Sequence, residues 1–512
     1  MEGKSVLKVN VKWGRESLSA DIDVKADLTA FKKELQRLTT VPIEKQKILF
    51  KGKILKDDMA LADLGITEGA AIMLMGAAEG KALAEQTQKT VFVEDLTAQE
   101  KAKIFKEQTG EVLPSGLVNM GNTCYMNASL QCLRRINEFK ESVQKFSNQD
   151  TAPDVKLTRS LKNLMTYLDN TDESVKPIEF FQNLTIIRPH FGEMQHGGGG
   201  FKQQDADECF QAIIDAVAPY LTYENLEGDK ENLIDFLFRI DFKATIRNQE
   251  NPDEPAETRT EYNRKLSCII DNQKNPIDHL FDGIKAALDE SVTKYSPSLS
   301  RDAEYIKSSR ISRLPPYLVV QKIRFLWKKA SDTTGSKATK AKILRNVSFP
   351  KILDLYPLCD SELQQKLDKG RAYEKKQLEE KAESDKGRFE KYKKDLELQG
   401  KMMPDDSRSL YKQFQETLME EETKSHDELL YRTPGTGLET GNYQLVAVLT
   451  HKGRTSDSGH YVGWVHKKGD DWLKYDDDVV SVVKFEEISN LRGGGDWHMA
   501  YYCIYRKLEV SQ

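Results

Sequence analysis

The chain has 512 residues, of which 38% are apolar and 31% are charged, and its formal net charge is -5. This mild acidity argues against a dedicated nucleic-acid-binding protein, which would carry a basic face. The start of the chain alternates apolar and polar residues, unlike a signal peptide, and no run of about 18 apolar residues predicts a membrane span. Six cysteines without a C-x-x-C pair indicate neither a disulfide framework nor a zinc site, so we expect a reducing compartment, no metal and no cofactor.

Residues 4–76 are predicted to form a compact unit. Apolar residues alternate over 7–13 and again over 18–24, which is typical of a hairpin with one buried face. Phe31, Leu35 and Leu38 have helical spacing, and the helix should stop before Pro42. Two short strands in "QKILFKGKIL" and a last strand in "AIMLM" complete the order of a β-grasp fold.

The same segment, with "KILFKGKIL" and "LADLGITEGAAIMLM", resembles ubiquitin along its whole length. Where ubiquitin ends in a diglycine, this chain has Gly76-Ala77-Ala78, so the resemblance implies a fused ubiquitin-like domain that is not cleaved and conjugated. Leu49 and Met75 match the exposed apolar patch by which ubiquitin binds partners. The alternative is that both are ordinary surface residues.

The remainder of the chain divides into a linker and one large domain. Residues 77–105 are rich in Ala, Lys, Glu and Gln and indicate a partly helical, flexible linker. Residues 106–507 contain predicted helices near 124–136 and 204–220 and several late strands. An insert at about 361–430 mixes both charge signs at helical spacing, which favours a solvated helical pair over a partner-docking arm.

Cys124 lies in "GLVNMGNTCYMNASLQCL", where a loop of small polar residues runs into a predicted helix. At the first turn of a helix, the dipole and the free N–H groups favour a thiolate. Unpaired cysteine is also among the most buried residue types. This stretch alone therefore leaves Cys124 equally open as a nucleophile and as a core residue, whereas Cys132, two turns later, is expected in the core.

A thiolate nucleophile needs a base and a group that orients the base. His460 opens the predicted strand "HYVGWVH", and Asp476 ends the next strand across a Gly-Asp turn. Because neighbouring strands are close, the Asp476 carboxylate could accept the imidazole N–H and fix its tautomer. The other histidines that we considered are less well placed, since His466 lies toward the turn and His451 lies before the loop.

The Cys124 and His460 segments and the stretch "QQDADEC" at 203–209 together resemble the ubiquitin-specific protease family. The resemblance covers about residues 110–507 and implies an α+β chain, with a papain-like domain of fingers, palm and thumb after the β-grasp domain. It implies Cys124 as nucleophile, His460 as general base and acid, and Asp476 as the orienting carboxylate, with Asp477 as its rival. Asn119 matches the family position that stabilises the oxyanion.

The resemblance also assigns a substrate and its contacts. Family members read the basic C-terminal tail of ubiquitin in a narrow channel, and Gln203, Asp205 and Glu208 match positions near that path. The same residues would also suit an ordinary polar helix start, because acidic side chains there complement the helix dipole. The structural zinc-binding C-x-x-C pairs of many members are absent, in keeping with no metal.

A ubiquitin-like domain ahead of this catalytic domain resembles a proteasome-associated member of the family. This implies ubiquitin conjugates as substrates, docking on the proteasome regulatory particle, and a location in the cytoplasm and, with the proteasome, the nucleus. It further implies that the loops at Arg454–Gly459 and about 328–342 obstruct the tail channel until the proteasome binds. The alternatives are a non-catalytic ubiquitin-binding regulator and an enzyme for another ubiquitin-like modifier.

Overall fold

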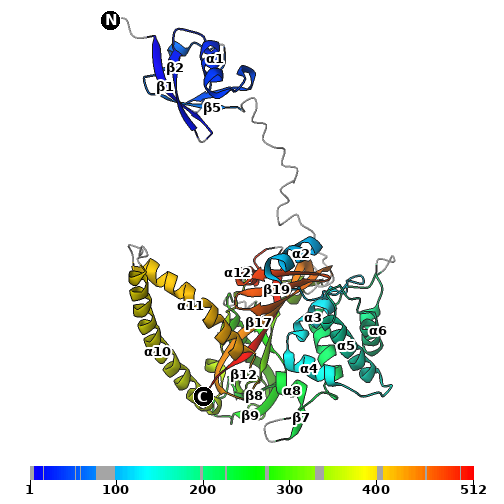
Figure 1. Cartoon of the computed structure of the whole chain (residues 1–512). Helices are drawn as coiled ribbons and strands as arrows, with labels where there is room; N and C mark the ends of the chain where they lie inside the picture. The colour runs from blue at the N-terminus through cyan, green and yellow to red at the C-terminus, as the bar shows by residue number, and fades with distance from the viewer. Residues whose placement is uncertain are drawn as a thin grey trace. The chain divides into compact units, whose positions relative to one another are not determined.

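The computed structural model describes residues 5–511, except for residues 15, 52, 58, 77–97, 196–199, 225–227, 271–275, 329–338, 400–406, 456–457 and 496 (Figure 1). The chain divides into two compact units, Met1–Leu96 and Thr97–Gln512, each with its own hydrophobic core. Ala77 and Ala78, and with them most of the expected linker, lie outside the described residues.

The first unit is a five-stranded sheet in the order β2-β1-β5-β3-β4, with one helix packed on it. Strands β1 and β5 are parallel, and the other neighbours are antiparallel. The helix begins after Asp27, whose carboxylate accepts the Ala30 N–H, and ends at Thr40 in the left-handed conformation. This is the expected β-grasp arrangement. Its elements are β1 (Val6–Trp13), β2 (Glu16–Asp23), α1 (Leu28–Thr39), β3 (Lys47–Phe50), β4 (Lys53–Ile54) and β5 (Ala71–Met75).

The second unit begins with a layer of helices. Helix α2 (Ala98–Thr109) belongs to this unit, since Phe105 packs against its main core, whereas the sequence analysis ended the linker at residue 105. The layer corresponds to the thumb that the family resemblance implied. Helix α2 itself packs against strand β20 (Val479–Lys484) of the main sheet. The members of the layer are α3 (Cys124–Arg134), α4 (Asn137–Lys145), α5 (Pro153–Asp169), α6 (Ile178–Ile187) and α7 (Ala206–Val217).

The main sheet, in the position of the palm, has the strand order β10-β13-β21-β17-β18-β19-β20, and β16 pairs with β17. Side chains alternate between its two faces, so Tyr461 and Val465 join the helical layer while Val462 and Trp464 join a second core. Both faces are therefore covered. The strands are β10 (Leu266–Ile269), β13 (Tyr317–Ile323), β16 (Ile352–Asp354), β17 (Leu438–Thr455), β18 (Ser458–Lys468), β19 (Asp471–Asp476), β20 (Val479–Lys484) and β21 (Met499–Val510).

A separate four-stranded sheet, in the order β11-β12-β8-β9, occupies the place of the fingers. Its strands are β8 (Ile240–Asn248), β9 (Glu257–Asn263), β11 (Asp289–Ser296) and β12 (Arg301–Arg313). The shorter elements are β6 (Thr222–Glu224), β7 (Lys230–Asn232), α8 (Leu233–Phe238), α9 (Leu280–Ala287), β14 (Phe325–Lys328), β15 (Thr339–Lys342) and α12 (Phe485–Ser489). No helix in the described part of the chain combines the length and the apolar run that a bilayer crossing requires.

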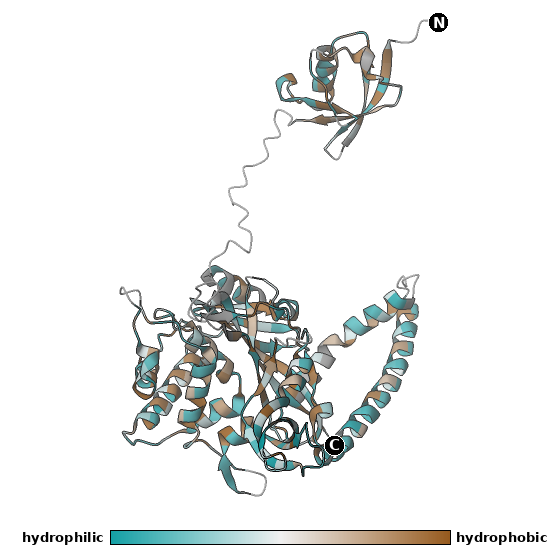
Figure 2. Cartoon of the chain, turned by 180° about the vertical axis from the view of Figure 1, so that it is seen from behind, coloured by the Kyte–Doolittle hydropathy of each residue, from teal (hydrophilic) through white to brown (hydrophobic). Residues whose placement is uncertain are grey.

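The expected charged insert consists of two long helices, α10 (Ser361–Leu398) and α11 (Ser407–Leu430), which are hydrophilic over most of their length (Figure 2). Leu363 and Leu367 anchor the start of α10 in the second core. Farther along, the Phe389 ring contacts the rings of Tyr411 and Phe414 on α11. Both helices are therefore held by a few apolar contacts while their charged faces remain in solvent.

Gly370 lets α10 lie directly on β17, because a Cβ atom there would collide with the Glu439 carbonyl oxygen. Gly370→Ala should therefore destabilise the chain by about 1–3 kcal/mol. Gly387→Ala on the same helix is the matched control, since nothing lies within 4 Å of its added Cβ. It should stabilise the helix by about 0.5–1 kcal/mol. Urea unfolding of both full-length variants measures the difference, and equal midpoints would refute the close packing.

Candidate active site

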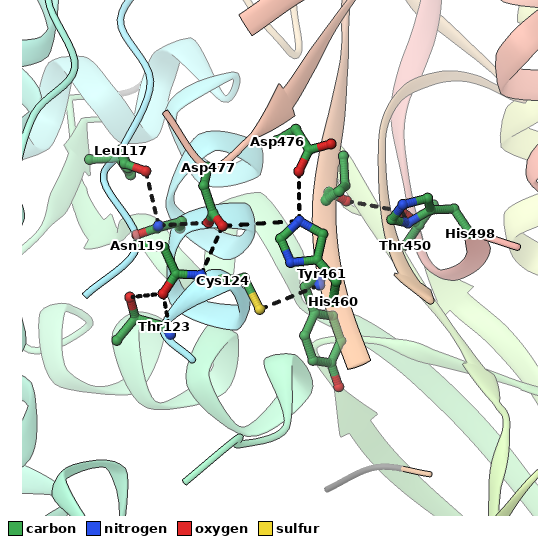
Figure 3. A network of polar contacts seen from close by, with 12 residues as sticks. Leu117, Asn119, Thr123, Cys124, Thr450, His460, Tyr461, Asp476, Asp477 and His498 are labelled. Atoms are coloured by element: carbon green, nitrogen blue, oxygen red, sulfur yellow. Dashed lines mark hydrogen bonds and ion pairs between the residues drawn. The ribbon is translucent and has the colours of Figure 1, made fainter. Parts of the chain in front are cut away.

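Cys124 is the first residue of α3, and only 1% of its surface is exposed. Its sulfur accepts the Tyr461 main-chain N–H at 3.4 Å (Figure 3). Gln203 Nε2 lies 3.7 Å from the same sulfur. Cys132 is fully buried on the same helix, and burial raises the pKa of its thiol to about 12. The contacts therefore set Cys124, at the meeting of α3 and β18, apart from this inert core thiol.

The small polar residues before Cys124 build the loop that leads into α3. Asn119 Oδ1 accepts the main-chain N–H groups of Gly121 at 2.9 Å and Thr123 at 3.1 Å. The Thr123 hydroxyl accepts the Met120 N–H at 2.9 Å. Asn122 adopts a positive φ of 58°, which asparagine tolerates better than most residues. The side chains thus replace the main-chain partners that a tight turn lacks, and they fix the start of the helix.

His460 and Asp476 form the second half of the site. His460 Nε2 lies 2.6 Å from Asp476 Oδ1, which leaves Nδ1 as the ring nitrogen for the thiol (Figure 3). Hydrogen bonds with Asp476 and then with Cys124 raise the pKa of His460 to about 10. Burial alone would raise the pKa of Asp476, but hydrogen bonds from His460 and Lys474 hold that pKa below its ordinary value. The arrangement favours an imidazolium beside the thiol.

Asp477, the rival of Asp476, has a different set of partners. Its carboxylate accepts hydrogen bonds from Asn119 Nδ2 at 2.9 Å and Asn127 Nδ2 at 2.8 Å, and it lies 4.0 Å from His460 Nε2. Burial raises the pKa of Asp477 despite these bonds. The His460 imidazole therefore bonds to Asp476, whereas the two asparagine amides bond to Asp477.

The Asn119 side chain is held by hydrogen bonds at both its oxygen and its nitrogen. The oxygen is occupied by two main-chain N–H groups, and the nitrogen donates one hydrogen to Asp477. A carboxamide nitrogen carries two hydrogens, so a second donor remains. Asn119 therefore retains one amide hydrogen to donate.

The three residues assigned to the ubiquitin tail have different surroundings. Gln203 is buried, and its side chain reaches the Cys124 sulfur. Asp205 caps α7 through the Asp207 N–H and accepts the Tyr501 hydroxyl at 2.8 Å. The Glu208 side chain is 55% exposed and lies 3.0 Å from His190 Nε2. Gln203 is therefore at the thiol, whereas Glu208 is at the surface.

His498 lies near the site although no motif pointed to it, and Lys342 is the last residue of the loop that was expected at about 328–342. The His498 ring lies 6.2 Å from that of His460. Lys342 Nζ lies 2.7 Å from His451 Nδ1 and donates to the carbonyls of His451 and Gly453. His498 has no periodic or motif-like signal, although "WH" directly before the last strand marks an aromatic pair.

The expected partner patch lies on the outer face of the first unit's sheet. Met75 is 53% exposed and Leu49 is half-buried. Leu49 pairs across the strands with Met73 and Ile54, which are also exposed. The apolar surface is therefore larger than the two residues taken from the sequence. Among the described residues, no group of His, Cys, Asp and Glu has the geometry of a metal site.

Asp476→Asn tests the charge that supports His460. The substitution keeps the shape of the side chain and removes its negative charge, so the pKa of His460 should fall well below 10. NMR of histidine ring carbons across a pH titration measures the midpoint, with His460→Ala identifying the signal. Asp471→Asn, on the same strand and paired with Lys484, should leave the midpoint unchanged. A midpoint that Asp476→Asn does not lower would contradict the assigned pair.

Comparison with known proteins agrees with this geometry. Residues 115–505 match the ubiquitin carboxyl-terminal hydrolase family, and residues 7–79 match the ubiquitin family. Ubiquitin carboxyl-terminal hydrolase 6 of Arabidopsis thaliana is 36% identical, over 98% of this chain and 99% of that protein. Ubiquitin carboxyl-terminal hydrolase 14 of Caenorhabditis elegans is 34% identical, over 98% of this chain and 94% of that protein. Ubiquitin carboxyl-terminal hydrolase 6 of Schizosaccharomyces pombe is 32% identical, over 99% of this chain and 100% of that protein.

These relatives share the whole length of the chain, including the order of its two domains. The family match extends from just before Cys124 to the end of the main sheet, so it includes every element that contributes to the site. The chain belongs to the ubiquitin carboxyl-terminal hydrolase family, and it is a cysteine deubiquitinase with a ubiquitin-like domain ahead of its catalytic domain.

Proposed function

We propose that Cys124 is the nucleophile of this deubiquitinase, that His460 is its general base and acid, and that Asp476 orients the imidazole. The observation that carries the proposal is the order of contacts, with Nε2 of His460 on Asp476 and Nδ1 left for the thiol. A nucleophile, a base and a group that orients the base are what covalent acyl transfer requires. The roles follow the motifs that first suggested them.

The reaction begins when the Cys124 thiolate attacks the carbonyl carbon of ubiquitin's terminal glycine. The tetrahedral intermediate collapses as the C–N bond breaks, and His460 gives its proton to the departing lysine amine. Water then attacks the thioester, with His460 taking the proton, and the C–S bond breaks to release ubiquitin. Asp476 keeps the imidazole in position and balances its positive charge through both steps.

Asn119 is proposed to stabilise the tetrahedral oxyanion. Its oxygen and one of its amide hydrogens are already held, so the second N–H is pre-oriented beside the start of α3. The main-chain N–H groups at that helix end face the same region and favour negative charge. Gln203, Asp205 and Glu208 are proposed to contact the ubiquitin tail, with Gln203 nearest to the scissile bond.

Activity measurements test these roles. Cys124→Ala should abolish labelling by ubiquitin that carries a C-terminal electrophile. Asn119→Ala should lower kcat for a fluorogenic ubiquitin substrate by about 10²–10³ with little change in KM, because the lost bond forms with the transition state. Asn183→Ala, an exposed amide on α6, is the control and should match the native chain. Labelling that survives Cys124→Ala would remove Cys124 from the mechanism.

We further propose that the ubiquitin-like domain docks this enzyme on the proteasome regulatory particle, in the cytoplasm and the nucleus. Met75, Met73 and Ile54 are about half exposed on one face of its sheet, and a contiguous apolar surface of this kind marks a protein-binding site. The domain lacks the terminal diglycine that conjugation needs. Its retention in full-length relatives is in keeping with a docking role.

Activation by the proteasome completes the proposal. The segments Arg454–Gly459 and 328–342 lie around the tail channel in the family resemblance, although residues 329–338 and 456–457 lie outside the described part of the chain. The two segments are linked at their described ends, because Lys342 Nζ donates hydrogen bonds to the carbonyls of His451 and Gly453. A shift of one segment would therefore act on the other.

Proteasome stimulation is the expected result. Purified proteasomes should raise the rate at which the native chain cleaves a fluorogenic ubiquitin substrate. Met75→Glu should abolish both the stimulation and co-sedimentation with proteasomes, because it places a charge in an apolar contact. Met59→Glu, at an exposed methionine outside the sheet, should retain both. An equal rate with and without proteasomes would show that activation is wrong, and unchanged binding of Met75→Glu would place docking elsewhere.

A further inference from the structure

The two faces of β18 divide the surroundings of the site. Tyr461 points to the thumb side, where its ring contacts those of His451 and Tyr501, and Tyr501 in turn donates to Asp205. Val462 and Trp464 point to the opposite face. The His460 ring lies at the start of the strand, 6.2 Å from the ring of His498, which in turn lies 6.3 Å from that of Trp464. The proposed tail contacts therefore lie on one face, and a second group of rings lies beside His460 on the other.

His498 begins this second group and is firmly held. It is only 6% exposed, and its Nδ1 lies 3.3 Å from Thr450 Oγ1, which also accepts the Trp464 indole N–H at 2.9 Å (Figure 3). The His498 ring crosses that of His460 at 68° and that of Trp464 at 75°. Burial, and then Lys474, lower the pKa of His498 to about 4. It is thus a fixed, neutral ring and adds no charge beside His460.

Trp497 is the outermost ring of the group. Its centroid lies 5.8 Å from that of His498, at an interplanar angle of 87°, and Lys452 Nζ lies 5.2 Å from the indole ring. Lys452 is also the cross-strand neighbour of His460 in the β17–β18 pairing. Although both neighbours steady the indole, 61% of Trp497 remains exposed. A large aromatic surface is therefore exposed to water near the proposed general acid, and the His498 ring lies between them.

The chemistry of the cleavage indicates what meets this surface. The general acid must lie beside the nitrogen that leaves, so the lysine side of the isopeptide bond lies toward His460, away from the tail contacts. A lysine amine is carried on a flexible four-carbon stem, which must continue outward past His460. Among the described residues, Trp497 is an exposed ring that His498 links to His460.

We infer that Trp497 is the acceptor-side specificity residue of this enzyme, and that its free face packs against the ubiquitin-bearing lysine and the adjacent peptide of the conjugated protein. Methylene groups pack favourably against an aromatic face, and the lysine ammonium released by cleavage is attracted to that face by a cation–π interaction. The inference rests on the proposed role of His460. It adds a contact to the part of the substrate that is not ubiquitin.

Two probes separate this contact from the rest of the site. One is ubiquitin with a C-terminal electrophile, which has no acceptor, and the other is ubiquitin joined through an isopeptide bond to a lysine in a labelled peptide. Trp497→Ala should lower kcat/KM for the peptide conjugate about three- to tenfold, chiefly through KM. Its labelling by the electrophile should change less than twofold. Trp497→Phe should restore most of the cleavage, because an aromatic face remains.

Tyr167→Ala is the matched control, since Tyr167 is also 61% exposed but lies on α5 in the thumb. It should cleave the conjugate at the native rate. Native-like cleavage by Trp497→Ala would overturn the inference. Equal losses in cleavage and labelling would also overturn it, because Trp497 would then only support His460. Failure of the proposed catalytic roles would be recognised separately, as labelling that persists after Cys124→Ala.

Discussion

The buried carboxylate of Asp477 is the contact on which the geometry of the site depends. It accepts one hydrogen bond from Asn119 and one from Asn127, which are 358 and 350 positions earlier in the chain. The main-chain oxygen of Asp477 accepts the Leu117 N–H as well. A buried carboxylate is tolerated only when such partners compensate it. The loop before α3 and the turn after β19 are therefore held together, and the thiol and the imidazole are held with them.

Two consecutive aspartates thus serve opposite purposes because their surroundings differ. Asp476 is partly exposed and contacts two cationic groups, His460 and Lys474, so it is suited to balance a charge that appears during the reaction. Asp477 has a φ of 56° and turns inward to two neutral amides, so it is suited to fix distances. A similar separation is proposed across β18, with the ubiquitin tail beside Tyr461 and the departing amine beside His460.

Much of the fold could be predicted because its signals are local. The β-grasp unit, the helix that begins at Cys124 and the hairpin of β18 and β19 all follow from hydrophobic period and turn residues. The roles within the site could not be derived in this way. The local sequence left Cys124 open as a core residue, and the contacts of its sulfur with His460, Tyr461 and Gln203 come from segments far away in the chain. The contact of Gln203 with the sulfur, and the place of His498 beside the imidazole, depend on how separate segments pack, which no periodicity encodes.

The position of β21 has a consequence for the synthesis of the enzyme. The strand is the last element of the chain, yet it lies between β13 and β17 near the centre of the main sheet. A nascent chain that has not reached residue 499 lacks the strand on which its neighbours pair, so the thumb and the His460 hairpin have no complete sheet to pack on. The ubiquitin-like domain, by contrast, has all its strands within residues 6–75 and can fold as soon as it leaves the ribosome. The ubiquitin-like domain can thus be complete during translation, whereas the main sheet of the catalytic domain is complete only near the end of synthesis.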